Sequence, residues 1–127
     1  MPNRIGPIVG GRVFVRDLHA ARRFYAEALG LTEIFANAQI ARFDTGGLML
    51  VVEQVAADDE EGEELVGRYS GLVFHAPDVA AVQRAFQETS AAGVRWSEPP
   101  APTFWGGMMG HFADPEGNEH TLLYTPS

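Results

Sequence analysis

The sequence predicts an α+β fold made of two β-α-β-β-β modules. The first observation is an internal repeat, in which an apolar strand ends at an aspartate, Asp17 or Asp78, and a helical stretch follows. The second observation is that each half closes on a hairpin, with turn residues at 45–47 and at 114–118. One such unit cannot cover both faces of its small sheet, so we expect the two modules to pack together in a single domain.

The first module is expected at about residues 8–54. Alternation over residues 8–16 places Val13 and Val15 on the face that packs against a helix. Asp17 is suited to cap that helix, and Gly30 supplies the left-handed position at its end. The expected helix stripe is Leu18, Ala21, Phe24, Tyr25 and Ala28, and the later strands are expected at 32–35, 39–44 and 48–54.

The second module is expected at about residues 70–125, after an acidic linker at 55–69. A strand at 71–76 leads to the cap Asp78 and to a helix that Gly93 ends. The expected helix stripe is Val79, Val82, Ala85, Phe86 and Thr89, and the last hairpin is expected at 108–113 and 119–124. Prolines follow a short strand at 94–97, which predicts a loop or an edge segment because proline donates no amide hydrogen.

The composition excludes several classes of protein. A formal net charge of -8 argues against a nucleic-acid partner, which requires a basic face. The chain has no cysteine for thiolate chemistry and no lysine for a Schiff base. Residues 1–6 lack the features of a signal peptide and no segment is long enough to span a bilayer, so we expect a cytoplasmic protein without a membrane partner. The acidic residues at 58–64 are interpreted as a solvated linker.

Three segments resemble a known family: residues 14–18, residues 24–31 and residues 112–118. Together they are similar to the opening and closing signatures of the vicinal oxygen chelate superfamily. That superfamily includes glyoxalase I, extradiol dioxygenases, fosfomycin-resistance enzymes and bleomycin-resistance binding proteins. The resemblance spans about residues 8–124 and implies a glyoxalase-like fold, in which each module curls a mixed sheet around a cleft. It also implies a homodimer, because the family often completes the cleft with a second copy.

The metal enzymes of this family take one ligand, usually His or Glu, from the first and last strand of each module. Counting from the cap and turn aspartates leads to four positions in this chain: Gly10, Leu50, Gly71 and Thr121. Glycine and leucine have no side-chain donor, and one threonine hydroxyl is a poor ligand for zinc, nickel or iron. The resemblance therefore implies a cleft without a metal at these positions and without another cofactor.

We therefore expect a metal-independent binding protein of the glyoxalase/bleomycin-resistance type, which sequesters an apolar or aromatic small molecule in the cleft. The expected ligand-binding residues are Arg12, Phe14, Leu50, His75, Trp96, Phe104, Trp105, Met109 and Thr121. Period-two geometry directs His75 into the cleft and His120 to the opposite face, as a structural residue bonded to backbone. The neighbouring Phe104 and Trp105 suit either a lid over the ligand or a dimer contact.

The residues also leave an enzyme open, namely a glyoxalase-like lyase, isomerase or dioxygenase. In that case His75 is the candidate general base, or His75, His111 and Glu119 form a relocated metal site. The pattern does not fix the direction of His111. Arg12 either pairs with an anionic group of a ligand or reaches solvent, and Trp96 belongs either to the core or to the cleft wall.

Overall fold

The computed structural model describes residues 4, 6 and 8–126, apart from the side chains at positions 69 and 71, so part of the N-terminal segment considered above lies outside it. It confirms the predicted α+β class with two β-α-β-β-β modules. The first module consists of β1 (Gly10–Val15), α1 (Leu18–Arg23), η1 (Phe24–Ala28), β2 (Thr32–Ala36), β3 (Ile40–Asp44) and β4 (Met49–Gln54). After α2 (Glu60–Leu65), the second module consists of β5 (Tyr69–His75), α3 (Val79–Ala91), β6 (Arg95–Pro102), β7 (Met108–Ala113) and β8 (Glu119–Tyr124).

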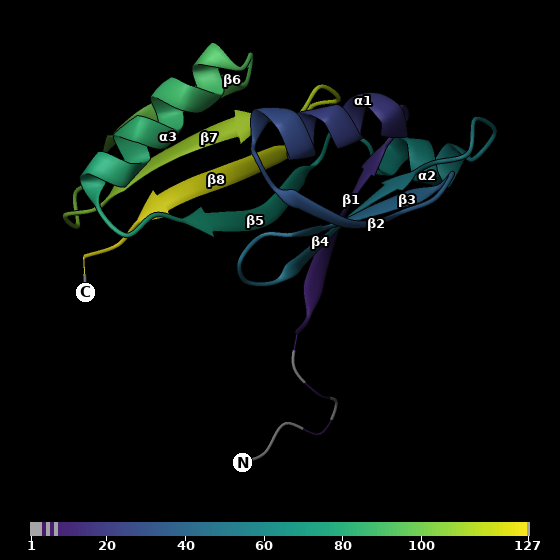
Figure 1. The fold of residues 1–127 in the computed structure, drawn as a ribbon, viewed down its shortest axis with the longest axis horizontal. Coiled ribbons are helices and arrows are strands. Elements are labelled where there is room, and N and C mark those ends of the chain that lie inside the picture. The colour runs from purple at the N-terminus through teal and green to yellow at the C-terminus, as the bar shows by residue number, and fades with distance from the viewer. Residues whose placement is uncertain (1–3, 5, 7, 127) are drawn as a thin grey trace.

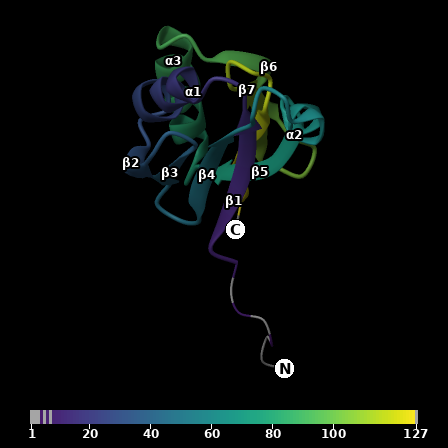
Figure 2. The ribbon, with the colours of Figure 1, turned by 90° about the vertical axis from the view of Figure 1, so that its right-hand side faces the viewer.

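Each module forms a four-stranded mixed sheet, in the order β1-β4-β3-β2 in the first and β5-β8-β7-β6 in the second. The first and last strands of a module are parallel neighbours, and the other pairs are antiparallel. Figure 1 shows the two sheets side by side, with α1 and α3 above them. In Figure 2, β1 lies between β4 and β5, so the modules meet along the edge strands β1 and β5. We call the sheet face turned away from α1 and α3 the open face.

Both helices begin at the predicted aspartates. The Asp17 carboxylate accepts a hydrogen bond from the Ala20 amide at 3.1 Å, and the Asp78 carboxylate accepts one from the Ala81 amide at 2.7 Å. The first helix widens into the π-helical turn η1, in which the Leu29 amide bonds to the Phe24 carbonyl at 3.0 Å. Such turns insert one extra residue, and here the turn includes Tyr25, which is fully buried against both modules.

The proline-rich segment of the second module is an edge strand. β6 continues through the prolines to Pro102 and pairs only with β7, so one side of it faces no strand. Its register shifts between Trp96 and Glu98 and again between Glu98 and Ala101. These irregularities accommodate the missing amide donors, and the strand extends beyond the predicted 94–97.

The acidic linker includes a helix that the charge pattern did not predict. The Asp59 carboxylate accepts a hydrogen bond from the Gly62 amide at 3.0 Å and begins α2. Glu60 and Glu61 lie in the first turn, where the helix dipole favours negative charge, and Glu63 forms an ion pair with Arg16. The like charges that suggested only a solvated linker therefore also suit a short capped helix. In the described part of the chain, no helix is long and apolar enough to cross a membrane.

Candidate functional site

The register of the strands shows which side chains share the open face. Arg12 on β1 lies opposite Val51 on β4, and Val73 on β5 lies opposite Thr121 on β8. Val51 is therefore the counterpart of Thr121 in the repeat. Leu50 was assigned that role from counting, but it points to the core face, where it is only 2% exposed. The assignment was one residue out, and one residue reverses the face of a strand.

The residues at the family's metal positions do not form a metal site. A Cβ atom at Gly10 would lie 2.5 Å from the Met49 carbonyl oxygen, so a ligating side chain cannot be placed there without moving the backbone. Val51 has no donor atom, and the surroundings of Gly71 lie outside what the structure describes. Thr121 is buried and its hydroxyl lies 2.9 Å from Nδ1 of His111. These residues therefore do not fit a divalent metal.

The relocated metal site is also absent from the described structure. Nowhere among the described residues do three or more His, Cys, Asp or Glu side chains gather closely enough to hold a metal ion. The combination of His75, His111 and Glu119 is therefore wrong as a metal site.

One junction between the modules is sealed by side chains of the turn at 114–118. The carboxylate of Glu116 accepts hydrogen bonds from the backbone amides of Arg16 and of Asp17, the latter at 2.8 Å. The side-chain amide of Asn118 donates to the carbonyl oxygen of Phe14 at 2.8 Å. The turn of the second module is thus bound to the end of β1 and the start of α1 in the first module.

The pseudo-symmetric junction is open. There the turn at 45–48 of the first module faces β5, as Figure 1 shows, and it follows Asp44 as residues 115–118 follow Asp114. Gly46 and Leu48 stand where the second module has Glu116 and Asn118, so the turn lacks the two side chains that seal the other junction. A cavity of about 570 Å³ remains, lined by Gly11, Thr45, Gly46, Gly47, Leu48, Met49, Leu50, Leu72, Val73, Phe74 and His75.

This cavity, which we call the junction cavity, is mostly apolar. His75 contributes the one titratable side chain among the lining residues. Close packing limits the cavity on one side, since a Cβ atom at Gly11 would lie 2.6 Å from a methyl carbon of Leu72. A volume of this size and lining suits a small organic molecule. The sequence does contain a signal for this cavity: the turn at 114–118 has Glu116 and Asn118, whereas the turn at 45–48 has neither a glutamate nor an asparagine.

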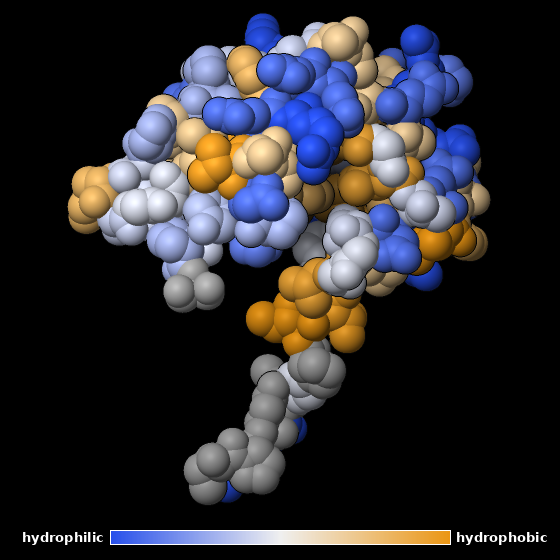
Figure 3. Space-filling model, turned by 60° about the vertical axis from the view of Figure 1, so that its left-hand side comes forward, coloured by the Kyte–Doolittle hydropathy of each residue, from blue (hydrophilic) through white to orange (hydrophobic). Residues whose placement is uncertain are grey.

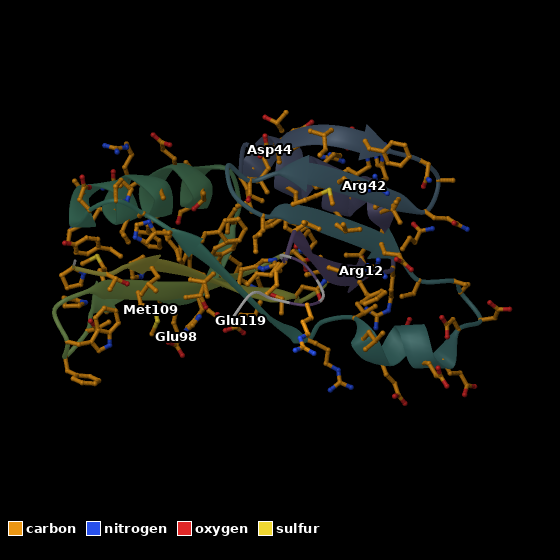
Figure 4. The ribbon with its side chains drawn as sticks, turned by 90° about the horizontal axis from the view of Figure 1, so that it is seen from below. Arg12, Arg42, Asp44, Glu98, Met109 and Glu119 are labelled. Carbon is orange, nitrogen blue, oxygen red and sulfur yellow. The ribbon has the colours of Figure 1, made fainter. Side chains whose placement is uncertain are left out.

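The other expected ligand-binding residues are distributed over the molecule. Arg12 and Met109 lie on the open face, on different sheets (Figure 4). Arg12 forms an ion pair with Glu53 at 3.4 Å, and Phe14 lies beside α2, near Leu65. The junction cavity brings together only Leu50 and His75 of the expected set.

The aromatic residues of the second module have three different environments. Phe104 is completely exposed at the tip of the loop between β6 and β7. Trp105 covers Gly107 so closely that a Cβ atom there would lie 2.0 Å from the indole ring. Trp96 belongs to the core of the module, where its indole N–H donates to the Thr89 hydroxyl at 3.1 Å and its ring packs on Phe112.

The structure settles the direction of His111. Its neighbours in the sheet are Glu98 on one side and Thr121 on the other, so all three side chains are on the open face. Nε2 of His111 lies 3.8 Å from a carboxylate oxygen of Glu98. Figure 4 shows Glu98 and Glu119 on this sheet, and Arg12, Arg42 and Asp44 on the other.

His120 lies on the face opposite His75, as predicted, but it bonds to side chains rather than to backbone. Its Nε2 lies 2.8 Å from the Tyr25 hydroxyl and its Nδ1 lies 2.9 Å from the Ser70 hydroxyl. The Tyr25 hydroxyl donates to Asp114 at 2.9 Å, so the proton between Tyr25 and His120 belongs to Nε2. Burial lowers the pKa of His120 to about 4, against a smaller raising effect of Asp114, and burial beside Asp114 raises the pKa of Tyr25.

Paired β-α-β-β-β modules with a cavity at their junction define a class of small domains that includes both binding proteins and enzymes. A sequence model described as the Glyoxalase/Bleomycin resistance protein/Dioxygenase superfamily matches residues 4–122. The chain therefore belongs to this superfamily, and the resemblance drawn from its sequence motifs is confirmed. No curated protein matches the chain significantly.

Solved structures share the fold at low sequence identity. A superfamily member from Sphaerobacter thermophilus DSM 20745 has a TM-score of 0.78 at 23% identity, covering 95% of this chain and 98% of its own. A superfamily enzyme from Burkholderia phytofirmans PsJN has a TM-score of 0.77 at 21% identity, covering 95% and 100%. Lactoylglutathione lyase from Agrobacterium tumefaciens has a TM-score of 0.75 at 22% identity, covering 96% of both chains. At these identities the likeness establishes the fold alone.

Proposed function

We propose that the protein binds an apolar or aromatic small molecule in the junction cavity, without a metal at the family's ligand positions. The observation that supports this most is the asymmetry of the two junctions. Side chains of the turn at 114–118 fill one junction, whereas the turn at 45–48 leaves about 570 Å³ beside His75 in the other. Apolar contact supplies most of the affinity, and the imidazole supplies orientation.

Replacing His75 with alanine should weaken the binding of prodan, a neutral aromatic fluorophore, about fivefold, because one wall of the cavity loses about 1 kcal/mol of contact. Prodan emission shifts to shorter wavelength in an apolar site, so titration of the fluorophore measures the affinity directly. The matched control is His19→Ala, since His19 is exposed on α1 outside the cavity. Addition of EDTA should leave the affinity unchanged. Equal loss in both variants, or loss with EDTA, contradicts the proposed site.

We also propose that two copies associate through the open face. Ile8 and Val9 at the base of the N-terminal segment are 77% and 65% exposed, in the hydrophobic area that Figure 3 shows there. Val73 is 55% exposed on the open face. Met109, on the second module's half of the same face, is 36% exposed (Figure 4). Removing these exposed apolar side chains from water favours the association of two copies.

Met109→Asp should convert the dimer to monomer at micromolar concentration, because association would bury an unpaired carboxylate where an exposed apolar side chain now lies. Sedimentation velocity measures the change. Val79→Asp is the control, since Val79 is also exposed but lies at the start of α3 on the opposite side of the sheet. A monomeric wild-type protein, or an unchanged dimer in the Met109 variant, rules out this interface.

A further inference from the structure

We propose that the junction cavity recognises its ligand through an N–H donor that bonds to the backbone carbonyl oxygen of His75, and that it selects against carboxylates. This inference rests on the proposed function and specifies the chemistry of that ligand.

The sealed junction provides the template for the N–H donor. There the side-chain amide of Asn118 donates to the Phe14 carbonyl oxygen at 2.8 Å. Phe14 precedes the cap Asp17 by three residues, and His75 precedes the cap Asp78 by three. The His75 carbonyl is therefore the counterpart of the Phe14 carbonyl, which accepts the hydrogen bond from Asn118.

The His75 carbonyl faces the seam between the modules. The amide of the next residue, Ala76, donates to Leu123 on β8 at 2.9 Å. Successive residues of a strand direct their backbone groups to opposite sides, so those of His75 point away from β8. Leu48 takes the place of Asn118 in the turn across the cavity, and its side chain donates no hydrogen bond. An N–H group of a ligand supplies the missing donor.

The open junction does not repeat the groups that hold the Glu116 carboxylate in the sealed junction. Glu116 is held by the amides of Arg16 and Asp17, and the Arg16 guanidinium lies 3.7 Å from its carboxylate. The counterpart of Arg16 is Pro77, which has neither an amide hydrogen nor a charge. A carboxylate in the open junction would therefore lose a cation and one of two amide donors.

Four probes that share the 2-naphthoyl group test the inference by titration, followed by intrinsic fluorescence or calorimetry: 2-naphthamide, N-methyl-2-naphthamide, N,N-dimethyl-2-naphthamide and 2-naphthoate. We expect the two amides with an N–H group to bind about tenfold more tightly than the dimethyl amide, and naphthoate to bind most weakly. Equal affinity for all four overturns the inference and leaves the proposed function standing. If none of the four binds and prodan also fails to bind, the proposed function itself fails.

Leu48→Asn tests the same point from the protein side. The new side-chain amide reproduces the sealed junction and competes for the His75 carbonyl, so the tenfold preference for N–H amides should disappear. Leu48→Ala is the matched control, which removes apolar contact but should keep the preference. Leu48 is 51% exposed, so both variants are expected to fold, and thermal melting verifies this. A preference that persists in a folded Leu48→Asn protein overturns the inference.

Discussion

Replacing Asp114 with alanine should lower the free energy of unfolding by about 3–5 kcal/mol. Asp114 is only 2% exposed, and its carboxylate accepts hydrogen bonds at 2.9 Å from the Tyr25 hydroxyl and from the backbone and side-chain amides of Asn118. Removing the carboxylate leaves these buried donors without their acceptor, in the region where the turn at 114–118 binds the first module. Urea denaturation followed by circular dichroism measures the loss.

The first module contains the matched control. Asp44 precedes the corresponding turn and accepts one hydrogen bond, from the Gly46 amide at 2.8 Å, but it is exposed to solvent. Asp44→Ala should therefore cost about 1 kcal/mol or less. Similar losses of unfolding free energy in the two variants would mean that the buried hydrogen bonds of Asp114 stabilise the protein no more than the exposed bond of Asp44. Asp114→Asn, which keeps an acceptor but loses the charge, is expected to fall between them.

The elements that depend on local chemistry could be predicted from the sequence. Asp17 and Asp78 cap their helices as the pattern indicated, because a carboxylate at that position satisfies free amides whatever the tertiary context. The last hairpin has the predicted bounds, Met108–Ala113 and Glu119–Tyr124. The helix α2 was missed, because repulsion between the acidic side chains was weighed without the dipole and the cap that offset it.

The site was harder to predict, because it depends on how the two modules pack against each other. The direction of His75 followed from period two, but its environment is set by the turn at 45–48, which lies far from it in sequence. Leu50 was placed on the wrong face because the count stopped one residue short: Val51 follows Asp44 by seven residues, as Thr121 follows Asp114. Trp96 and Thr121 have neighbours that only the sheet register reveals, namely Phe112 and His111.

The repeat also shows how one scaffold position can hold different residues. Leu50 in the first module and His120 in the second are counterparts, each one residue before the paired positions Val51 and Thr121. Both are buried on the core face of their sheets, and their relative exposures are 2% and 0%. Leucine packs there without a hydrogen bond, whereas the buried imidazole requires hydrogen bonds to the hydroxyls of Tyr25 and Ser70. The second module therefore contains a titratable group where the first contains none.

Acidification from pH 7 to pH 4 should lower the free energy of unfolding by about 3 kcal/mol through His120 alone. In the unfolded chain the imidazole has its ordinary pKa of 6.5, and burial lowers the pKa to about 4 in the folded protein. Between these values the unfolded state binds a proton that the folded state does not. The free energy of unfolding is therefore unaffected by the titration of His120 above pH 6.5, and it declines as the pH falls from 6.5 toward 4.

His120→Leu isolates this effect, because it places the first module's own residue at that position and removes the proton-binding group. The remaining hydroxyls keep partners: the Tyr25 hydroxyl still donates to Asp114, and the Ser70 hydroxyl can donate to the Glu119 carbonyl, 2.6 Å away. Carboxylates titrate in both proteins, so the informative quantity is the difference between their urea-denaturation stabilities at pH 7, 5.5 and 4.5. That difference should shift in favour of the leucine variant as the pH falls. Parallel stability curves would show that His120 is protonated as readily in the folded protein as in the unfolded chain.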